Sequence, residues 1–248
     1  MQKIDQAFII QSYRGGIEPY KNATTDVGLW ASEKYVIANY FEKQSRILDI
    51  GCGAGRTTAA LDRLGFHEVI GIDLNPEMIK AARAVAPKSK FRVGDATHLE
   101  SRDHAFDGVL FSFNGIMTIP GYTHRQKAFT EIYRVLKPGG HFIFTTHDRE
   151  EDIKFHDFWQ EEIVRWRRSK QDQRLFELGD LVTCSADVNH EIYIHIPSRV
   201  EVLHCLEQSG FQLLEDFWRP DRFVESEAVT KFSGDCRFWV VQKPFALL

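Results

Sequence analysis

Three glycines stand within five positions of the chain, at Gly51, Gly53 and Gly55, directly behind the apolar run "ILDI". A glycine-rich turn that ends a strand and opens a helix lets a ligand approach the backbone closely, which is typical of sites for nucleotide-like cofactors. The spacing does not fit a dinucleotide fingerprint, whose third glycine would stand at Arg56. It does not fit a P-loop either, because "GRTT" lacks the lysine. The alternative without a ligand is a tight turn whose glycines need positive φ.

Two aspartates follow at the ends of the next two expected strands. Asp73 in "GIDL" stands where a carboxylate can accept both hydroxyls of a ribose. Asp95 in "VGDA" can accept from an adenine amino group, while a backbone N–H beside it serves a ring nitrogen. Simpler roles compete, since Asp73 could cap the helix that starts at Pro76 and Asp49 could cap the turn after its own strand.

The elements that must position these residues alternate regularly from Arg46 to about Thr146. Short, nearly continuous apolar runs at 46–50, 68–74, 90–96, 106–113 and 141–147 predict five strands, with a turn at 137–140 before the fifth. Amphipathic stretches between them predict helices, and the one at 76–86 has its proline in the first turn. Strands of this kind separated by helices indicate an α/β fold whose parallel sheet is covered on both faces.

The rhythm changes after His147. A long helix is expected at about 150–171, with an aromatic and aliphatic stripe on one face, formed by Phe155, Phe158, Trp159, Ile163 and Trp166. Two extended segments around a polar turn at 187–189 follow, and then a helix from Ser198 to Gly210. Two final strands, at 211–218 and 236–243, are separated by a charged loop. We therefore expect residues 149–197 to form a lid inserted into the α/β core.

Four motifs in order, "LDIGCGAG", "GIDLNPEM", "VGDA" and "LKPGG", resemble those of the class I S-adenosylmethionine-dependent methyltransferases. The resemblance covers roughly residues 44–147 and the last two strands, and it is strongest to the small-molecule branch with ubiquinone- and menaquinone-biosynthesis enzymes. It implies a Rossmann-like, doubly wound, seven-stranded sheet, mostly parallel with an antiparallel last strand, to which the helix and β-hairpin lid expected from the pattern after His147 is added. It also implies one methyltransferase domain over 1–248, with residues 1–43 as a helical cap over the cofactor.

The resemblance implies that S-adenosylmethionine is the cofactor and S-adenosylhomocysteine the product. Its methionyl part would lie against the loop of Gly51, Cys52, Gly53 and Gly55, with Asp49 behind that loop accepting from its N–H groups or, through water, from the cofactor's ammonium. Asp73 would hold the ribose, and Leu74 and Met78 would pack near the adenine that Asp95 and Ala96 read. Carbonyls around Phe113 and Asn114 would face the ammonium, and Arg14 could pair with the carboxylate. Met78 as ordinary core, Asn114 as a turn residue and Arg14 as a solvated side chain are the competing interpretations.

Methyl transfer from a sulfonium needs mainly alignment and exclusion of water, so catalytic residues leave little trace in a sequence. His147 follows the fifth strand at the sheet edge where substrates bind, and it could deprotonate a hydroxyl or orient a carboxylate. An ordinary loop histidine is an equal alternative. We expect no metal site, because His190 and His195 would point to opposite faces of an extended strand.

Bulk composition bounds the class of protein. The 248 residues are 43% hydrophobic with a formal charge of −4, which indicates a globular protein without a global field for nucleic acid or anionic membranes. With four scattered cysteines, no signal peptide and no apolar run of membrane-spanning length, we expect a cytoplasmic protein. The leading hypothesis is a methyltransferase for a small-molecule acceptor. Alternatives are a tRNA or protein methyltransferase, a non-catalytic S-adenosylmethionine-binding protein and, least favoured, a nicotinamide-dependent oxidoreductase.

Overall fold

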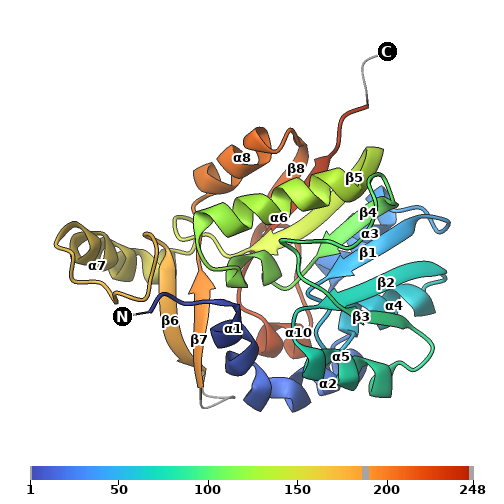
Figure 1. Cartoon of the computed structure of the whole chain (residues 1–248), viewed down its shortest axis with the longest axis horizontal. Helices are drawn as coiled ribbons and strands as arrows, with labels where there is room; N and C mark the ends of the chain where they lie inside the picture. Colours follow the sequence, from blue (N-terminus) through green and yellow to red (C-terminus); the bar gives the residue numbers. More distant parts are fainter. Residues whose placement is uncertain (1, 186–189, 246–248) are drawn as a thin grey trace.

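A seven-stranded sheet forms the centre of the computed structural model, which describes residues 2–185 and 190–245 (Figure 1). The strand order is β3-β2-β1-β4-β5-β9-β8. All pairings among the five strands β1 to β5 are parallel, whereas β9 runs antiparallel to both of its neighbours, β5 and β8. This confirms a mostly parallel sheet with an antiparallel last strand. The strands are β1 (Arg46–Ile50), β2 (Glu68–Asp73), β3 (Lys90–Val93), β4 (Phe106–Phe111), β5 (Leu136–Thr146), β8 (Gln212–Trp218) and β9 (Arg237–Gln242).

Helices cover both faces of this sheet, as the apolar strands require. One face packs against α3 (Ala31–Tyr40), α4 (Arg56–Arg63) and α5 (Pro76–Val85), and the other against α6 (Tyr122–Val135) and α8 (Arg199–Gln208). Local signals fix several helix starts. Asn75 caps α5 by accepting from the backbone N–H of Glu77 at 2.9 Å, and Ser198 and Glu201 form a capping box on α8.

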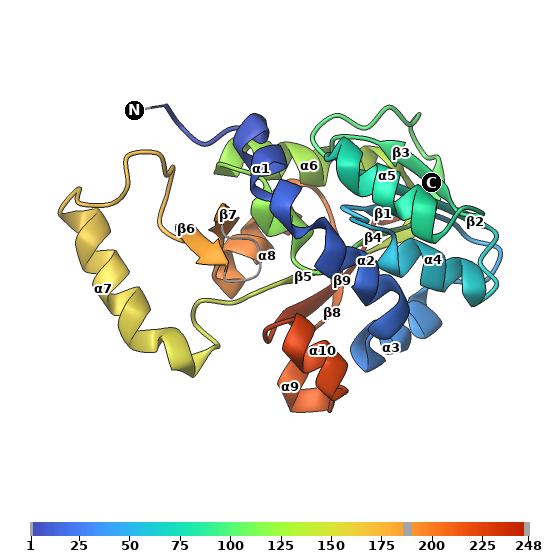
Figure 2. The same cartoon turned by 90° about the horizontal axis from the view of Figure 1, so that it is seen from below.

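The order of the strands reverses between β1 and β4, which are parallel neighbours in the sheet although β2 and β3 lie between them in sequence. In open α/β sheets a crevice forms at such a switch point, beyond the carboxyl ends of the strands. The N-terminal helices α1 (Gln6–Ser12) and α2 (Ile17–Asp26), with the short η1 (Arg14–Gly16) between them, pass across this edge (Figure 2).

Two segments differ from the sequence prediction. The expected turn at 137–140 is part of β5, because a register shift between Phe106 and Gly108 absorbs the extra residues within the pairing with β4. The charged loop between the last two strands contains two short helices, α9 (Arg219–Arg222) and α10 (Glu227–Phe232). Ser226 caps α10 by accepting from the backbone N–H of Val229. This is a local helix signal, but the many charged residues of the segment favoured a loop.

The segment 149–197 leaves the α/β core and returns to it. It holds η3 (Ile153–Phe155), α7 (His156–Arg167) and a hairpin of β6 (Asp180–Ser185) and β7 (His190–His195). The turn expected at 187–189 lies outside the described residues. The helix is shorter than predicted, and its apolar stripe is only partly covered: Trp159 is buried, whereas Phe155 and Phe158 are 53% and 39% exposed.

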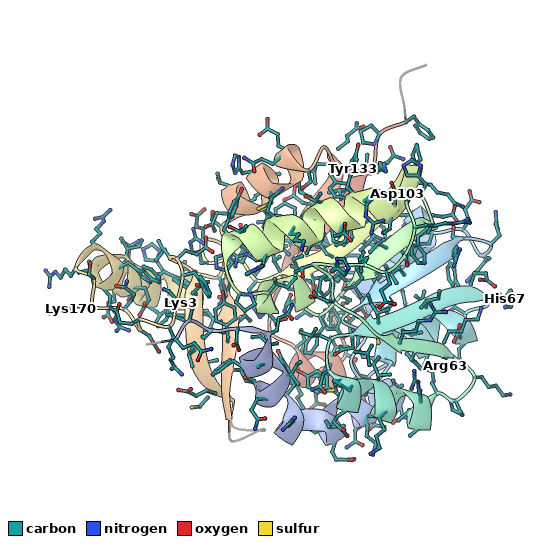
Figure 3. The ribbon with its side chains drawn as sticks, in the orientation of Figure 1. Lys3, Arg63, His67, Asp103, Tyr133 and Lys170 are labelled. Atoms are coloured by element: carbon teal, nitrogen blue, oxygen red, sulfur yellow. The ribbon has the colours of Figure 1, made fainter. Side chains whose placement is uncertain are left out.

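In both cartoon views α7 stands away from the sheet (Figures 1 and 2). Lys170, just beyond its end, lies at the opposite side of the molecule from Arg63 and His67 (Figure 3). None of the helices among the described residues is both long and apolar enough to cross a membrane.

Candidate active site

A cavity of about 460 Å³ opens at the carboxyl edge of β1, β2, β3 and β4, beneath α1. Its volume is that of a typical small-molecule site. Of the predicted cofactor-binding residues, the cavity is lined by Gly51, Gly53, Asp73, Leu74, Met78, Asp95, Ala96 and Phe113. The fold thus brings together residues from four separate strand ends.

The three glycines have different reasons to be glycine, although φ is positive at all of them, +61°, +53° and +91° in chain order. A Cβ on Gly51 would lie 2.7 Å from the ring of Phe111, and one on Gly55 would lie 2.8 Å from the ring of Phe91. At Gly53 the nearest atom would be 3.8 Å away, in the ring of Tyr20, so this residue presents open backbone to the cavity. Gly55 does not line the cavity, contrary to the expectation that all three admit the cofactor.

Asp73 is half-buried at the end of β2 and faces the cavity. Its two carboxylate oxygens accept from the backbone N–H groups of Gly53 at 2.9 Å and Asn75 at 2.8 Å. Burial raises its pKa, and these two hydrogen bonds oppose the rise. The N-cap of α5 is Asn75, so Asp73 does not have the capping role that was the alternative to ribose binding. Each carboxylate oxygen keeps a lone pair for a ligand hydroxyl.

Asp95 closes the far side of the cavity, beyond β3. One of its oxygens accepts from the backbone N–H and the hydroxyl of Thr97, both at 2.8 Å. The other accepts from the side-chain amide of Gln6 in α1 at 2.6 Å. Sequence reasoning missed Gln6, which ties the N-terminal helix to the predicted adenine-reading acid. Ala96 and Met78 are buried beside it and supply an apolar surface for a ring.

Asp49 lies behind the glycine loop and is buried, but its partners are not the predicted N–H groups. It accepts from the hydroxyls of Thr57 at 2.5 Å and Thr58 at 2.6 Å, at the start of α4. Burial raises its pKa to about 6, although both hydroxyls lower it. Asp49 and Cys52 line a smaller space of about 40 Å³ that adjoins the main cavity at Gly51 and Gly53. Burial also raises the pKa of the Cys52 thiol, which is therefore no nucleophile.

Phe113 and Asn114, after β4, both have positive φ, +53° and +61°, and point to different sides. Phe113 lines the cavity and stacks on Phe232 of α10 with ring centroids 4.7 Å apart, and Tyr20 packs edge-on against both rings. Asn114 is buried outside the cavity, and its backbone N–H donates to the Thr145 hydroxyl at 2.9 Å. Its position therefore fits the turn-stabilising alternative better than cofactor binding.

His147 lies half-buried after β5 and does not line the cavity. Its Nδ1 is 2.7 Å from the carbonyl oxygen of Asp235, and its Nε2 is 3.2 Å from the side-chain amide of Asn114. Burial lowers its pKa and thus favours the neutral ring, in which Nδ1 would donate to the carbonyl oxygen and Nε2 would accept from the amide. Both nitrogens are thus occupied, and this geometry does not support the predicted role as a base.

Arg14 is exposed in η1 and is not among the cavity residues. Its neighbour Tyr13 does line the cavity, and burial together with Asp73 raises the pKa of its hydroxyl to about 12. The residue in the place of a third glycine, Arg56, pairs instead with buried Glu33 of α3. Sequence reasoning noted Arg56 only as a departure from a motif and missed Glu33, whose type carries no local signal for burial.

The remaining wall of the cavity is apolar. It is formed by α1 and the residues just before it and by the segment that follows η2 (Gly115–Thr118). Its apolar residues are Ile4, Ile9, Ile10, Ile119 and Pro120. The exposed His124 also lines the cavity, with Nδ1 3.0 Å from the carbonyl oxygen of Pro120.

The residues present fit S-adenosylmethionine. Open backbone at Gly53 suits the methionyl chain, two carboxylate oxygens of Asp73 suit the vicinal ribose hydroxyls, and Asp95 with Ala96 and Met78 suits an adenine ring. Among the described residues, no lysine or arginine lines this cavity.

The comparisons with known proteins point to the same class. Residues 48–144 match the family described as "Methyltransferase domain". Demethylmenaquinone methyltransferase of Lactiplantibacillus plantarum is 33% identical over 181 residues, which cover 70% of this chain and 73% of that protein. Phosphoethanolamine N-methyltransferase 2 of Caenorhabditis elegans is 28% identical over 227 residues, which cover 83% of this chain but 49% of that protein.

Two solved structures share the fold. A methyltransferase from Methanosarcina mazei described as S-adenosylmethionine-dependent has a TM-score of 0.69 and 23% identity, with 85% of this chain and 97% of that one covered. The [4+2]-cyclase SpnF has a TM-score of 0.67 and 17% identity, with 99% of each chain covered.

Fold and site together define an α/β enzyme that binds a nucleoside cofactor. The chain belongs to the class I S-adenosylmethionine-dependent methyltransferases, in the branch that resembles quinone-biosynthesis enzymes.

Proposed function

We propose that this methyltransferase acts on a small, largely apolar acceptor that binds between α1 and the segment after η2. The observation that carries the proposal is the apolar wall of Ile9, Ile10 and Ile119, which continues the cavity beyond the residues suited to the cofactor. Apolar walls with few polar groups are typical of sites for small organic ligands. The quinone-methylating relatives favour the same class of acceptor.

The cofactor supplies an activated methyl group, and the chain's task is to align the acceptor with it and to keep water away. Tyr20 and Phe113 stand next to the glycine loop and would shield the reacting end. The Tyr13 hydroxyl, with its pKa raised to about 12, stays protonated at neutral pH and can donate to an acceptor oxygen. His124 lines the acceptor part of the cavity, and because its Nδ1 lies against the Pro120 carbonyl oxygen, its Nε2 is the candidate general base for an acceptor that must lose a proton.

We further propose that residues 1–43 cap the cofactor and that residues 149–197 act as a substrate lid supporting this cap. Gln6, Ile9 and Ile10 of α1 reach into the cavity, whereas the buried Tyr193 of β7 packs against Ile4 and Ile9 from behind. The hairpin of β6 and β7 therefore packs against α1, the helix that borders the space proposed for the acceptor.

The test uses S-adenosylmethionine labelled on its methyl group and a cell extract divided into metabolite, RNA and protein fractions. We expect label in the metabolite fraction, lost with Asp73→Ala and retained with Asp221→Ala, an exposed aspartate of α9. Label in RNA or protein would replace the small-molecule acceptor with a macromolecule. Bound cofactor without transfer to purified quinols, phenols or amines, or to any extract fraction, would favour a non-catalytic binding protein.

A further inference from the structure

A second cavity, of about 520 Å³, lies beside the cofactor cavity, and the two share Gly94 and Asp95 as lining residues. Its floor is the face of β1 and β2 that also carries the core beneath α6. Ile70 is the partly exposed residue of this floor, and it is paired in register with Leu48, which is buried, as is Ile72.

The cavity exists because the connection from β3 to β4 contains no helix among residues 94–105, all of which the structure describes. Helices normally cover both faces of a parallel sheet, and here α6 and α8 cover the part over β4, β5 and β9 and share one core with Leu48 and Ile72. Outside that core, over β1–β3, the loop of residues 94–105 lines the cavity.

This loop is held in place from α6. Arg134 donates to the carbonyl oxygens of Leu99 and Ser101, both at 2.8 Å, and Glu131 accepts from the backbone N–H of Leu99 at 2.8 Å. Asp103, beside the C-terminal end of α6 in Figure 3, also pairs with Arg134 at 2.8 Å. These bonds fix the loop above the floor, so the space is a built feature rather than a loose gap.

Three arginines line the cavity: Arg46, Arg92 and Arg102. Arg92 and Arg102 are exposed, and within the described chain neither forms a side-chain hydrogen bond or an ion pair. The guanidinium of Arg46 lies over the ring of Phe106, 5.2 Å from its centroid, and its Nε is buried without a hydrogen-bond partner.

The opposing acids of the lining are few. Two carboxylates of the lining, Asp95 and Glu100, face three arginines, and His98 adds a nitrogen base. The cavity therefore combines an apolar floor with a predominantly cationic edge.

We infer that this cavity is a second ligand site, which takes a small anion with an apolar body, such as an aryl or alkyl carboxylate, sulfonate or phosphate ester. The apolar body would lie against Ile70, above the buried Leu48 and Ile72, and the anionic head would accept from the arginines, whose planar guanidinium groups suit such oxyanions. The site does not depend on the identity of the methyl acceptor.

The probe is 8-anilinonaphthalene-1-sulfonate, titrated by fluorescence with S-adenosylhomocysteine at saturation so that the first cavity is filled. We expect one bound probe, a dissociation constant at least fivefold higher in Arg92→Gln/Arg102→Gln, and no change in the matched control Arg167→Gln on α7. N-phenyl-1-naphthylamine, which lacks the sulfonate, should bind at least fivefold more weakly than the anionic probe. Ile70→Trp, which fills the floor, should abolish binding.

If the probe bound in the absence of S-adenosylhomocysteine but not in its presence, the probe would lie in the cofactor cavity and the inference would be overturned. Equal affinity in the double arginine variant and the wild type would also overturn it, as would equal affinity for the neutral analogue. Both substituted arginines are exposed and unpaired, so the double variant is expected to fold, which circular dichroism checks.

Discussion

Arg56 and Glu33 form a buried ion pair with two parallel hydrogen bonds, each 2.7 Å long. The Glu33 carboxylate also accepts from the Ser112 hydroxyl and from the backbone N–H of Trp30 at 2.9 Å. Burial alone would raise the pKa of Glu33, but Arg56 and these donors hold it below its usual value. One carboxylate thus joins α3, the start of α4 and the end of β4, so it fixes the N-terminal segment to both sides of the glycine loop.

Glu33→Gln should destabilise the protein, because it leaves the Arg56 guanidinium buried without its counter-charge. Breaking one side of a buried pair costs about 3–5 kcal/mol, whereas replacing both sides with apolar residues is often neutral. Urea unfolding should therefore show a large loss for Glu33→Gln and a smaller one for Glu33→Leu/Arg56→Met. A single variant as stable as the wild type would contradict the structural role of the pair.

Alanine at Gly53 and at Gly51 should act differently. Both substitutions place a Cβ at positive φ, which costs roughly 1–2 kcal/mol. Gly51→Ala must in addition displace the buried ring of Phe111, so its melting temperature should fall further. Gly53→Ala has room within the protein, and its methyl group would occupy ligand space.

Calorimetry of the two glycine variants with S-adenosylhomocysteine separates these effects. We expect Gly53→Ala to bind S-adenosylhomocysteine more weakly than the wild type, while its free energy of unfolding falls only by the cost of the positive φ. Unchanged affinity in that variant would mean that the cofactor does not approach this loop.

Asp73→Ala should weaken binding of S-adenosylhomocysteine. It removes the acceptors assigned to the ribose and leaves the N–H groups of Gly53 and Asn75 unpaired. Loss of such buried partners costs about 1–3 kcal/mol, and Asp221→Ala serves as the exposed control. An affinity equal to that of the wild type would refute the ribose assignment.

Asp49 should make stability depend on pH in the acidic range. Its folded pKa of about 6 exceeds its ordinary value of 3.8, so its stabilising contribution is complete below about pH 4 and is lost as the pH rises through 6. The loss amounts to roughly 3 kcal/mol at most, since one pKa unit corresponds to about 1.4 kcal/mol.

The measurement is the unfolding free energy from pH 4 to 7, compared between the wild type and Asp49→Asn. The wild type should lose stability relative to the variant across this window, because asparagine does not ionise. A constant difference over the whole range would show that Asp49 does not titrate there.

Much of the fold could be predicted from the sequence because its signals are local. The apolar runs, Pro76, Ser198 and the glycine cluster each determine a strand, a helix start or a turn through nearby residues. The carboxyl ends of successive parallel strands meet at one edge, so Gly53, Asp73 and Asp95 could be assigned to one site from their positions alone.

Only the tertiary structure decided which side chains face that site. Asn114 and His147 follow strand ends as convincingly as Asp73 does, yet they bond to each other outside the cavity. Gln6 reaches Asp95, and Glu33 reaches Arg56, across long stretches of chain, and such contacts leave no periodicity in the sequence. Sequence determines which elements form because that depends on neighbouring residues, whereas the direction and partners of a side chain depend on packing between elements distant in sequence.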